Sequence, residues 1–227
     1  MPISDHVATR VAEVRERIAA ARARGGHGQD VTLIAVTKTH GPDAVMAAWD
    51  AGVRDVGENK VQEAEAKMAQ VTVPVRWHLI GHLQRNKAKN AAHFDLVHSL
   101  DSERLAVALD DAAGAAQRVL EVLVQVNVSG ESSKSGFALH ELPTVAERLN
   151  ACLHLRVRGV MTMAPFDADE LTLRTVFRGA REARSQLQSA GFGAEWLSMG
   201  MSGDYEVAVE EGATHVRLGT LLFGSRT

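Results

Sequence analysis

Residues 32–38 read TLIAVTK, a mostly apolar run that ends in a lysine. The run is too short for a typical helix and is rich in β-branched residues, so we predict a strand that is buried on both faces. Such strands are typical of parallel sheets that are covered by helices. The fold prediction therefore depends on whether runs of this kind recur along the chain.

Seven further runs of this kind follow, and helical stretches separate them. The predicted strands lie near residues 53–57, 75–80, 96–100, 119–128, 155–162, 196–199 and 215–218. The predicted helices lie near residues 42–51, 60–70, 84–92, 102–117, 139–150, 170–190 and 205–211. Hairpin turns such as Asn-Gly are absent between the strands, so we expect parallel pairing through right-handed crossovers. Eight strands that alternate with helices predict an α/β fold, a (β/α)8 TIM barrel.

An amphipathic helix is predicted before the first strand, over residues 5–24, because apolar residues recur there at spacings of three and four. An open doubly wound sheet is the alternative fold, but the glycine-rich fingerprints G-x-G-x-x-G and G-x-x-x-x-G-K-[ST] are absent from the sequence. A closed α/β barrel commonly occupies roughly 200 to 250 residues as one domain. We therefore expect residues 1–227 to form a single barrel domain with an extra N-terminal helix.

Composition excludes several classes of protein. The chain has 25 Lys and Arg against 28 Asp and Glu, a formal net charge of −3, which argues against binding nucleic acid or anionic lipid through overall charge. The first thirty residues lack the apolar segment of a secretory signal, and no stretch approaches the ~20 apolar residues of a membrane span. One cysteine, Cys152, cannot form an intramolecular disulfide and is typical of a reducing compartment. We expect a cytoplasmic protein that binds neither nucleic acid nor membrane.

Lys38 ends the first predicted strand, and chemistry in a (β/α)8 barrel lies at the carboxyl ends of the strands. Partial burial there would lower the pKa of the lysine amine from its usual value of about 10.4 and raise its neutral fraction. A neutral amine attacks an aldehyde or ketone to form a Schiff base. The alternative is a lysine that only reaches solvent from a strand end, and position alone does not separate the two interpretations.

The loops after the seventh and eighth predicted strands are rich in glycine and hydroxyl side chains. They read SMGMSGD at residues 198–204 and RLGT at residues 217–220. Glycines let backbone N–H groups approach an anion, and Ser202 and Thr220 can donate hydroxyl hydrogen bonds. Loops in this position form the phosphate site of many (β/α)8 barrels. Ordinary turn residues and a helix cap would explain either loop alone, but both loops fit an anion site.

An amine and a phosphate site on the same rim suggest pyridoxal 5′-phosphate (PLP), which carries an aldehyde and a phosphate on one ring. Arg217 would then lie where it can meet the pyridine nitrogen. A guanidinium only donates hydrogen bonds, so it would keep that nitrogen unprotonated and weaken the ring as an electron sink. Such a site suits cofactor carriage or restricted chemistry better than broad carbanion catalysis.

Several blocks of the sequence resemble the signature segments of the pyridoxal phosphate homeostasis proteins. The blocks are LIAVTK (33–38), GEN (57–59) with VQE (61–63), WHLIG (77–81) with LQ (83–84) and NK (86–87), SSKSG (132–136), LSMGMS (197–202), and VRLGT (216–220) with FG (223–224). They follow in matching order, and the resemblance extends from about residue 5 to residue 226. This family is similar to the barrel domain of alanine racemase, so the resemblance implies a fold-type III PLP-binding barrel.

The resemblance also implies a site and a function. PLP would be held as a Schiff base at Lys38, with Ser202, Gly219 and Thr220 at the phosphate, Arg217 at the ring nitrogen and Asn59 beside the cofactor. Family members are regarded as buffering or delivering PLP in intracellular vitamin B6 homeostasis, without an established catalytic activity. The implied partners are PLP and PLP-dependent apoenzymes, and we expect a monomer.

Other polar residues leave questions open. His82 and Arg85 depart from the family pattern, where smaller or uncharged residues are expected, so the role of their loop is open. Lys134 is either a surface lysine or a second amine that receives the aldehyde during transfer. His78 and His82 stand four residues apart, as in a helical metal-binding pair, but they span a strand and its loop without an acid or a third ligand nearby. A structural or surface role is the favoured interpretation for both histidines.

The sequence is compatible with three functions, of which cofactor carriage is favoured. A fold-type III PLP-dependent amino-acid racemase or lyase is the main alternative. Racemisation needs a base on each face of the substrate carbanion, yet the chain has one tyrosine, Tyr205, and no second domain to supply another. A class I aldolase that uses Lys38 on a sugar phosphate would share the amine and the anion site, but it predicts no bound chromophore.

Overall fold

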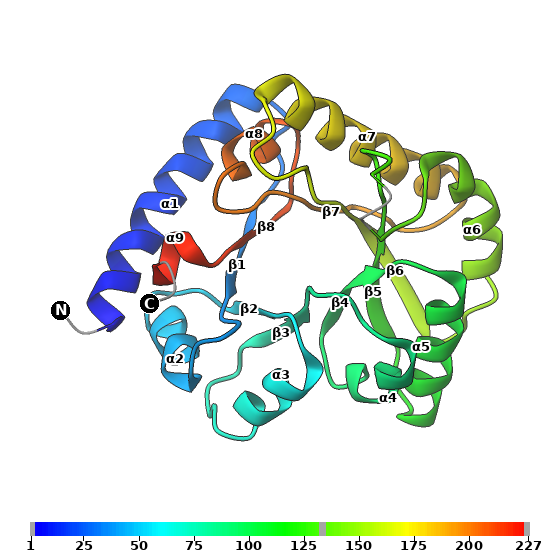
Figure 1. Cartoon of the computed structure of the whole chain (residues 1–227), viewed down its shortest axis with the longest axis horizontal. Coiled ribbons are helices and arrows are strands. Elements are labelled where there is room, and N and C mark those ends of the chain that lie inside the picture. Colours follow the sequence, from blue (N-terminus) through cyan, green and yellow to red (C-terminus); the bar gives the residue numbers. More distant parts are fainter. Residues whose placement is uncertain (1–2, 132–134, 225–227) are drawn as a thin grey trace.

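The eight predicted strands form a closed parallel barrel in the computed structural model, which describes residues 3–131 and 135–224 (Figure 1). Each strand pairs with the next in the chain, and β1 pairs with β8, so the sheet has no free edge. The strands are β1 (Thr32–Val36), β2 (Asp55–Glu58), β3 (Arg76–Leu79), β4 (Leu96–Leu100), β5 (Leu120–Gln125), β6 (Leu155–Met161), β7 (Trp196–Ser198) and β8 (His215–Leu218). The (β/α)8 prediction is confirmed.

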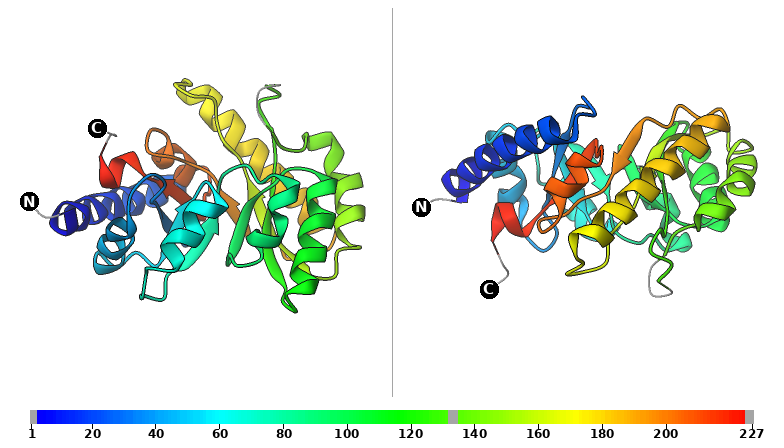
Figure 2. Two further views of the ribbon diagram at one scale, coloured as in Figure 1. Left: turned by 60° about the horizontal axis from the view of Figure 1, so that its bottom comes forward. Right: turned by 90° about the horizontal axis from the view of Figure 1, so that it is seen from above.

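Helices surround the barrel. They are α1 (Ile3–Gly25), α2 (Pro42–Asp50), α3 (Val61–Met68), α4 (Ala88–Ala91), α5 (Glu103–Ala115), α6 (Leu142–Leu149), α7 (Glu170–Ser189), α8 (Tyr205–Glu210) and α9 (Thr220–Phe223), with short 3-10 turns at Arg85–Lys87 and Leu139–Glu141. The predicted N-terminal helix is α1, and it packs against α2, α8 and α9 (Figure 2). Among the described residues, no helix is long and apolar enough to cross a membrane.

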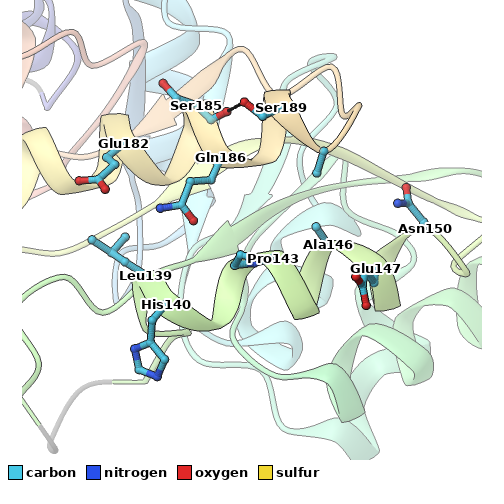
Figure 3. Close-up of a pocket in the computed structure, with 11 residues that line it drawn as sticks. Leu139, His140, Pro143, Ala146, Glu147, Asn150, Glu182, Ser185, Gln186 and Ser189 are labelled. Atoms are coloured by element: carbon cyan, nitrogen blue, oxygen red, sulfur yellow. Dashed lines mark hydrogen bonds between the residues drawn. The ribbon is translucent and has the colours of Figure 1, made fainter.

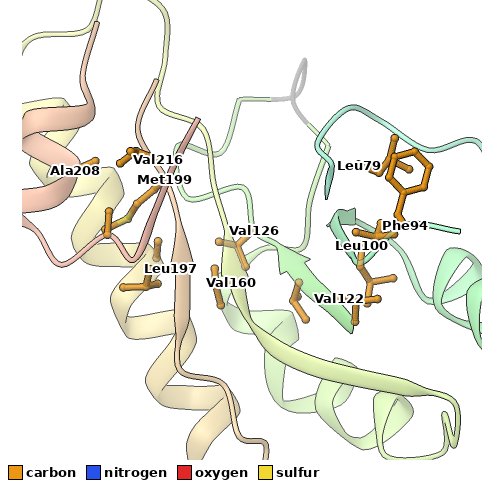
Figure 4. Packing of buried hydrophobic residues seen from close by; sticks show 14 of the residues in the cluster. Leu79, Phe94, Leu100, Val122, Val126, Val160, Leu197, Met199, Ala208 and Val216 are labelled. Atoms are coloured by element: carbon orange, nitrogen blue, oxygen red, sulfur yellow. The ribbon is translucent and has the colours of Figure 1, made fainter. Parts of the chain in front are cut away.

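The main hydrophobic core lies between the strands and the surrounding helices (Figure 4). Strand residues such as Val122, Val160 and Leu197 pack there, and burial of their side chains stabilises the barrel wall. A separate small cluster of Leu96, Leu123 and Met161 lies apart from this core, and we assign it to the barrel interior. Polar side chains occupy other interior positions, and those positions lead to the candidate site below.

Two predicted elements differ from the structure. The strand predicted over 119–128 ends at Gln125, because the chain then pairs with a residue of its own loop: Phe137 N–H donates to Gln125 O at 2.9 Å, and Asn127 N–H donates to Phe137 O at 3.0 Å. The helix predicted over 84–92 is instead a 3-10 turn followed by the four-residue α4. The apolar pattern does not predict where the end of a strand pairs with a loop, or where a 3-10 turn replaces an α-helix.

Gly159 provides a test of the barrel wall. It is the register partner of Trp196 on β7, and a Cβ at residue 159 would collide with the Trp196 backbone carbonyl. We expect Gly159→Ala to lower the free energy of unfolding by about 2–3 kcal/mol, because overpacking of this kind forces the strands apart. Denaturant unfolding measures the change. Gly193→Ala is the matched control, since its Cβ would meet no atom within 4 Å. Equal stabilities of the two variants would contradict the close approach of β6 and β7.

Candidate functional site

Lys38 lies in the turn that immediately follows β1, and its side chain is half-buried. β1 pairs with β8 through Ala35 and Leu218, so the residues just beyond each strand are neighbours. A Cβ on Gly219 would lie 3.2 Å from the Val36 carbonyl oxygen, which shows how closely the two strand ends approach. The predicted amine and the predicted phosphate loop therefore stand side by side.

Ser202 and the start of α9 lie in contact across two loops. The Leu221 N–H donates to Ser202 Oγ at 3.4 Å, and the N–H groups of Leu222 and Phe223 donate to Gly219 O at 2.9 Å each. The Leu221 N–H belongs to the first turn of α9, where backbone N–H groups lack partners inside the helix. The structure thus brings Ser202, Gly219 and Thr220 together at one end of the barrel.

Asn59 lies on the other side of Lys38. It follows β2, which pairs with β1, and its side chain is half-buried. Gly81, after β3, packs so closely on the Asn59 backbone that a Cβ there would collide with it. We call the loops that contain Ser202 and Gly219 the anion loops. The strand order β8, β1, β2 therefore places Lys38 between the anion loops and Asn59.

Arg217 is buried near the carboxyl end of β8, with 4% of its surface exposed. Its Nη1 donates to Ser198 Oγ at 2.6 Å, and its Nη2 donates to Thr162 O at 3.0 Å. Burial lowers the pKa of Arg217 to about 10, although the nearby Asp204 carboxylate acts in the opposite direction. The guanidinium therefore stays charged at neutral pH, and these two bonds use two of its five N–H groups.

A buried cluster of charged side chains fixes the two residues that flank Lys38. Lys67 Nζ, on α3, donates to Thr37 O at 2.7 Å, to Glu58 Oε1 at 2.7 Å and to Glu63 Oε1 at 3.0 Å. The Thr37 hydroxyl also donates to Glu58 Oε1 at 2.5 Å, and the Thr39 N–H donates to Glu63 Oε1. Both neighbours of Lys38 are therefore fixed by residues of β2 and α3.

The pKa values of the two carboxyl groups in this cluster are shifted in opposite directions. Burial raises the pKa of Glu58, and the hydrogen bonds from Lys67 and Thr37 only partly offset that effect. Burial also acts to raise the pKa of Glu63, but hydrogen bonds from Thr39 and Lys67 outweigh it, so the pKa of Glu63 is lowered. Lys67 is thus the charge that keeps a fully buried Glu58 compatible with the fold.

The remaining polar candidates lie apart from this site or outside the described residues. His78 is fully buried and contacts Asp55 and His98, whereas His82 is exposed, with its Nδ1 2.9 Å from Asp101 Oδ2. The described residues contain no group of three or more His, Cys, Asp or Glu side chains that could hold a metal ion. Arg85 is exposed in the 3-10 turn. Lys134 lies outside the described residues.

A groove of about 970 Å³ lies elsewhere, between α6 and α7 on the outside of the barrel (Figure 3). Pro143 and Ala146 line it from α6, and Gln186 and Ser189 line it from α7. Its lining residues include none of the loops that follow the carboxyl ends of β1, β7 and β8. We therefore assign no part of the candidate site to this groove.

Comparison with known proteins agrees with the arrangement of the barrel. The family model for the alanine racemase N-terminal domain matches residues 10–227. The pyridoxal phosphate homeostasis protein of Pseudomonas aeruginosa is 43% identical over 226 residues, which cover 99% of this chain and 96% of that protein. The protein of the same name from Escherichia coli is 39% identical over 226 residues, or 97% of each chain. The chain belongs to the pyridoxal phosphate homeostasis protein family.

Solved structures extend the comparison. PipY of Synechococcus elongatus, a structure with PLP bound, matches this homeostasis-family chain with a TM-score of 0.86 at 38% identity, covering 96% of this chain and 100% of that one. Alanine racemase from Corynebacterium glutamicum matches with a TM-score of 0.74 at 16% identity, and this chain covers 61% of its length. The second likeness shows the shared barrel fold.

The sequence did not predict several residues that contact the candidate site residues of this family member. Ser198 and Thr162 contact Arg217, and the cluster around Lys67 fixes the Lys38 turn. Polar residues inside buried strand runs were the available signal: His98 stands within LVHSL at residues 96–100 and Glu58 ends DVGE at residues 55–58. Such a residue needs a buried partner, but the sequence does not say which one.

A buried histidine at the amino-terminal end of β8 predicts a pH effect. His215 is 3% exposed, and burial above all, with the charges of Arg76 and Arg217 adding to it, lowers its pKa to about 3, although the Asp55 carboxylate acts in the opposite direction. The unfolded chain, with a histidine pKa of about 6.5, binds a proton that the folded chain does not bind, so stability is lost as the pH falls below about 6.5.

We expect His215→Gln to reduce the slope of the unfolding free energy between pH 6 and 5 by about 1 kcal/mol per pH unit. The exposed His93→Gln variant is the control, and an equal slope in both would contradict the prediction.

Proposed function

We propose that this chain binds PLP at the carboxyl end of the barrel and acts as a carrier or buffer of the cofactor in intracellular vitamin B6 homeostasis. The observation that supports this most directly is the meeting of Lys38, the Ser202 loop and the Gly219 loop around strands β1 and β8. Membership of the homeostasis-protein family and the PLP-bound structure of PipY point the same way.

The residues present fit the cofactor. PLP, when bound, supplies an aldehyde that condenses with a primary amine, an electron-accepting ring and a phosphate. Gly219 has no side chain to crowd an anion, and even a Cβ there would lie 3.2 Å from the Val36 carbonyl oxygen; the Ser202 hydroxyl lies at the same turn, where it contacts the Leu221 N–H. We assign Lys38 to the aldehyde, Ser202, Gly219 and Thr220 to the phosphate, Arg217 to the ring nitrogen, and Asn59 to a position beside the ring.

Two features favour carriage: the first argues against broad carbanion catalysis, and the second argues against racemisation. A buried Arg217 can only donate to the ring nitrogen, which leaves that nitrogen unprotonated and the ring a weaker electron sink. Tyr205, the one tyrosine of the chain, is 3% exposed on α8, which packs against α1, and Arg17 of α1 lies near its hydroxyl. It therefore does not offer a base at the barrel mouth. We further propose that the protein acts as a monomer in the cytoplasm and passes PLP to apoenzymes.

The proposed function is tested by adding PLP to the purified protein. We expect a visible absorption band, a mass increase matching one PLP after borohydride reduction, and an adduct that peptide mapping locates at Lys38. Transfer to a PLP-dependent apoenzyme is then followed by the recovery of that enzyme's activity. Turnover of D- or L-amino acids at rates of about 1 per second or more would favour the racemase or lyase alternative.

A further inference from the structure

A line of buried polar side chains crosses the inside of the barrel and ends at Arg217. We call its first four members, Asp55, His78, His98 and Ser198, the interior chain. Asp55 Oδ1 lies 2.9 Å from His78 Nε2, His78 Nδ1 lies 2.9 Å from His98 Nε2, His98 Nδ1 lies 2.8 Å from Ser198 Oγ, and Ser198 Oγ lies 2.6 Å from Arg217 Nη1. Four strands contribute to it, from the amino-terminal end of β2 to the carboxyl end of β7.

The interior chain is shielded from water except at its far end. His78, His98 and Ser198 are fully buried, and Asp55 is 8% exposed. Arg76, whose side chain is 45% exposed, stands at the amino-terminal end of the barrel with its Nη1 3.5 Å from Asp55 Oδ1. Buried polar atoms of this kind are costly unless each donor meets an acceptor, so the directions of the hydrogen bonds are constrained.

The two ends of the interior chain set the direction of every bond. Arg217 can only donate, so Ser198 Oγ accepts from it. The Ser198 hydroxyl hydrogen then points to His98 Nδ1, the other side-chain atom in contact with that oxygen among the described residues. His98 therefore carries its proton on Nε2 and donates it to His78 Nδ1.

The far end completes the same order. His78, accepting at Nδ1, carries its proton on Nε2 and donates it to Asp55. Burial acts to raise the pKa of Asp55, but His78 and Arg76 outweigh it and lower the pKa, so Asp55 is a carboxylate that accepts. Burial also lowers the pKa of His98 well below its usual range, in agreement with a neutral ring.

The reverse order leaves a buried group without a partner. A doubly protonated His78 could donate to both Asp55 and His98, and His98 would then donate from Nδ1 to Ser198. Ser198 Oγ would accept from Arg217 and from His98 together, and its own hydrogen would lose its acceptor in a fully buried place. That arrangement also puts a second positive charge inside the barrel, which already holds Arg217.

We propose that the interior chain holds Arg217 in one orientation toward the ring nitrogen of PLP, by turning the Ser198 hydroxyl hydrogen away so that its oxygen faces the guanidinium. His98 and Ser198 are thus positioning residues rather than catalytic ones. The inference rests on the proposed function for its consequence at the cofactor. The hydrogen-bond order itself is a property of the protein alone and can be tested without PLP.

The first experiment measures the histidine tautomers in the protein without added PLP. Nitrogen-15 NMR of the ring nitrogens at pH 7 is expected to show both His78 and His98 as neutral rings protonated at Nε2, with slowly exchanging protons. His78→Gln and His98→Gln variants assign the signals by their loss. A His98 ring protonated at Nδ1, or a positively charged His78, would overturn the proposed order.

The second experiment compares two buried serines. Ser198→Ala removes the acceptor of Arg217, and we expect it to weaken PLP binding about tenfold and to shift the visible absorption maximum, as loss of a hydrogen bond to a charged group should. Ser99→Ala is the matched control, because Ser99 is fully buried in β4 and its hydroxyl has no hydrogen-bond partner among the described residues. Ser198→Thr, which keeps a hydroxyl, is expected to restore the parent spectrum.

The outcomes separate this inference from the proposed function. If the parent protein binds PLP and Ser198→Ala matches Ser99→Ala in affinity and spectrum, the positioning role is wrong while the proposed function stands. If the parent protein takes up no PLP, the proposed function and the role of the interior chain toward the cofactor both fail. Denaturant unfolding of both alanine variants accompanies the comparison, so that a loss of folding is not mistaken for a loss of positioning.

Discussion

The Lys38→Ala variant is expected to lose covalent PLP completely. Lys38 is the lysine that the barrel sets between the Gly219 loop and Asn59, and its turn is fixed from both sides by the cluster around Lys67. Alanine supplies no amine, so the visible band of the adduct and the borohydride-stable mass increase should both disappear. Weak reversible binding through the anion loops and Arg217 should remain.

Two further variants serve as controls. One tests whether the adduct needs the amine of Lys38 or only its positive charge, and the other tests whether PLP labels exposed lysines non-specifically. Lys38→Arg keeps a positive charge of similar reach, but a guanidinium does not deprotonate and cannot attack the aldehyde, so we expect it to behave like Lys38→Ala. Lys60→Ala removes an exposed lysine at the start of α3 and should leave the adduct unchanged. An adduct that persists at full stoichiometry in Lys38→Arg would contradict the assignment of the site.

The barrel could be predicted from the sequence because its strands are buried on both faces. Runs such as TLIAV at residues 32–36 stay apolar without alternation, and their regular return between helices permits few topologies. Boundaries were less predictable, as β5 shows: it ends where Phe137 pairs with the chain beside it, a contact that follows from the path of a loop.

The candidate site could be predicted where its residues follow strand ends, and not where they depend on contacts between distant elements. Lys38, Ser202 and Gly219 follow β1, β7 and β8, so strand order alone brings them to one face. The contact between Lys67 and Thr37, and that between His98 and Ser198, joins residues 30 and 100 positions apart. Such pairs depend on the register of the closed barrel, which the apolar pattern does not specify.

Lys67→Met tests whether the ion cluster holds the turn that carries Lys38. The variant removes three hydrogen bonds from the Lys67 amine and leaves Glu58, which is fully buried, without its counter-charge. Breaking a buried pair by removing one partner typically costs about 3–5 kcal/mol of unfolding free energy, and we expect a loss of that size. The Thr37 carbonyl is released at the same time, so the affinity for PLP should fall as well.

The control for this variant is Lys89→Met, which removes an exposed lysine on α4 and should leave stability within about 0.5 kcal/mol of the parent protein. Glu58→Gln combined with Lys67→Met removes both charges and should recover part of the lost stability, because a neutral amide is cheaper to bury than an unpaired carboxylate. If the double variant is as unstable as Lys67→Met alone, packing of the lysine stem rather than charge explains the loss. If Lys67→Met unfolds like Lys89→Met, the cluster does not support the turn, and the position of Lys38 depends on the strand end alone.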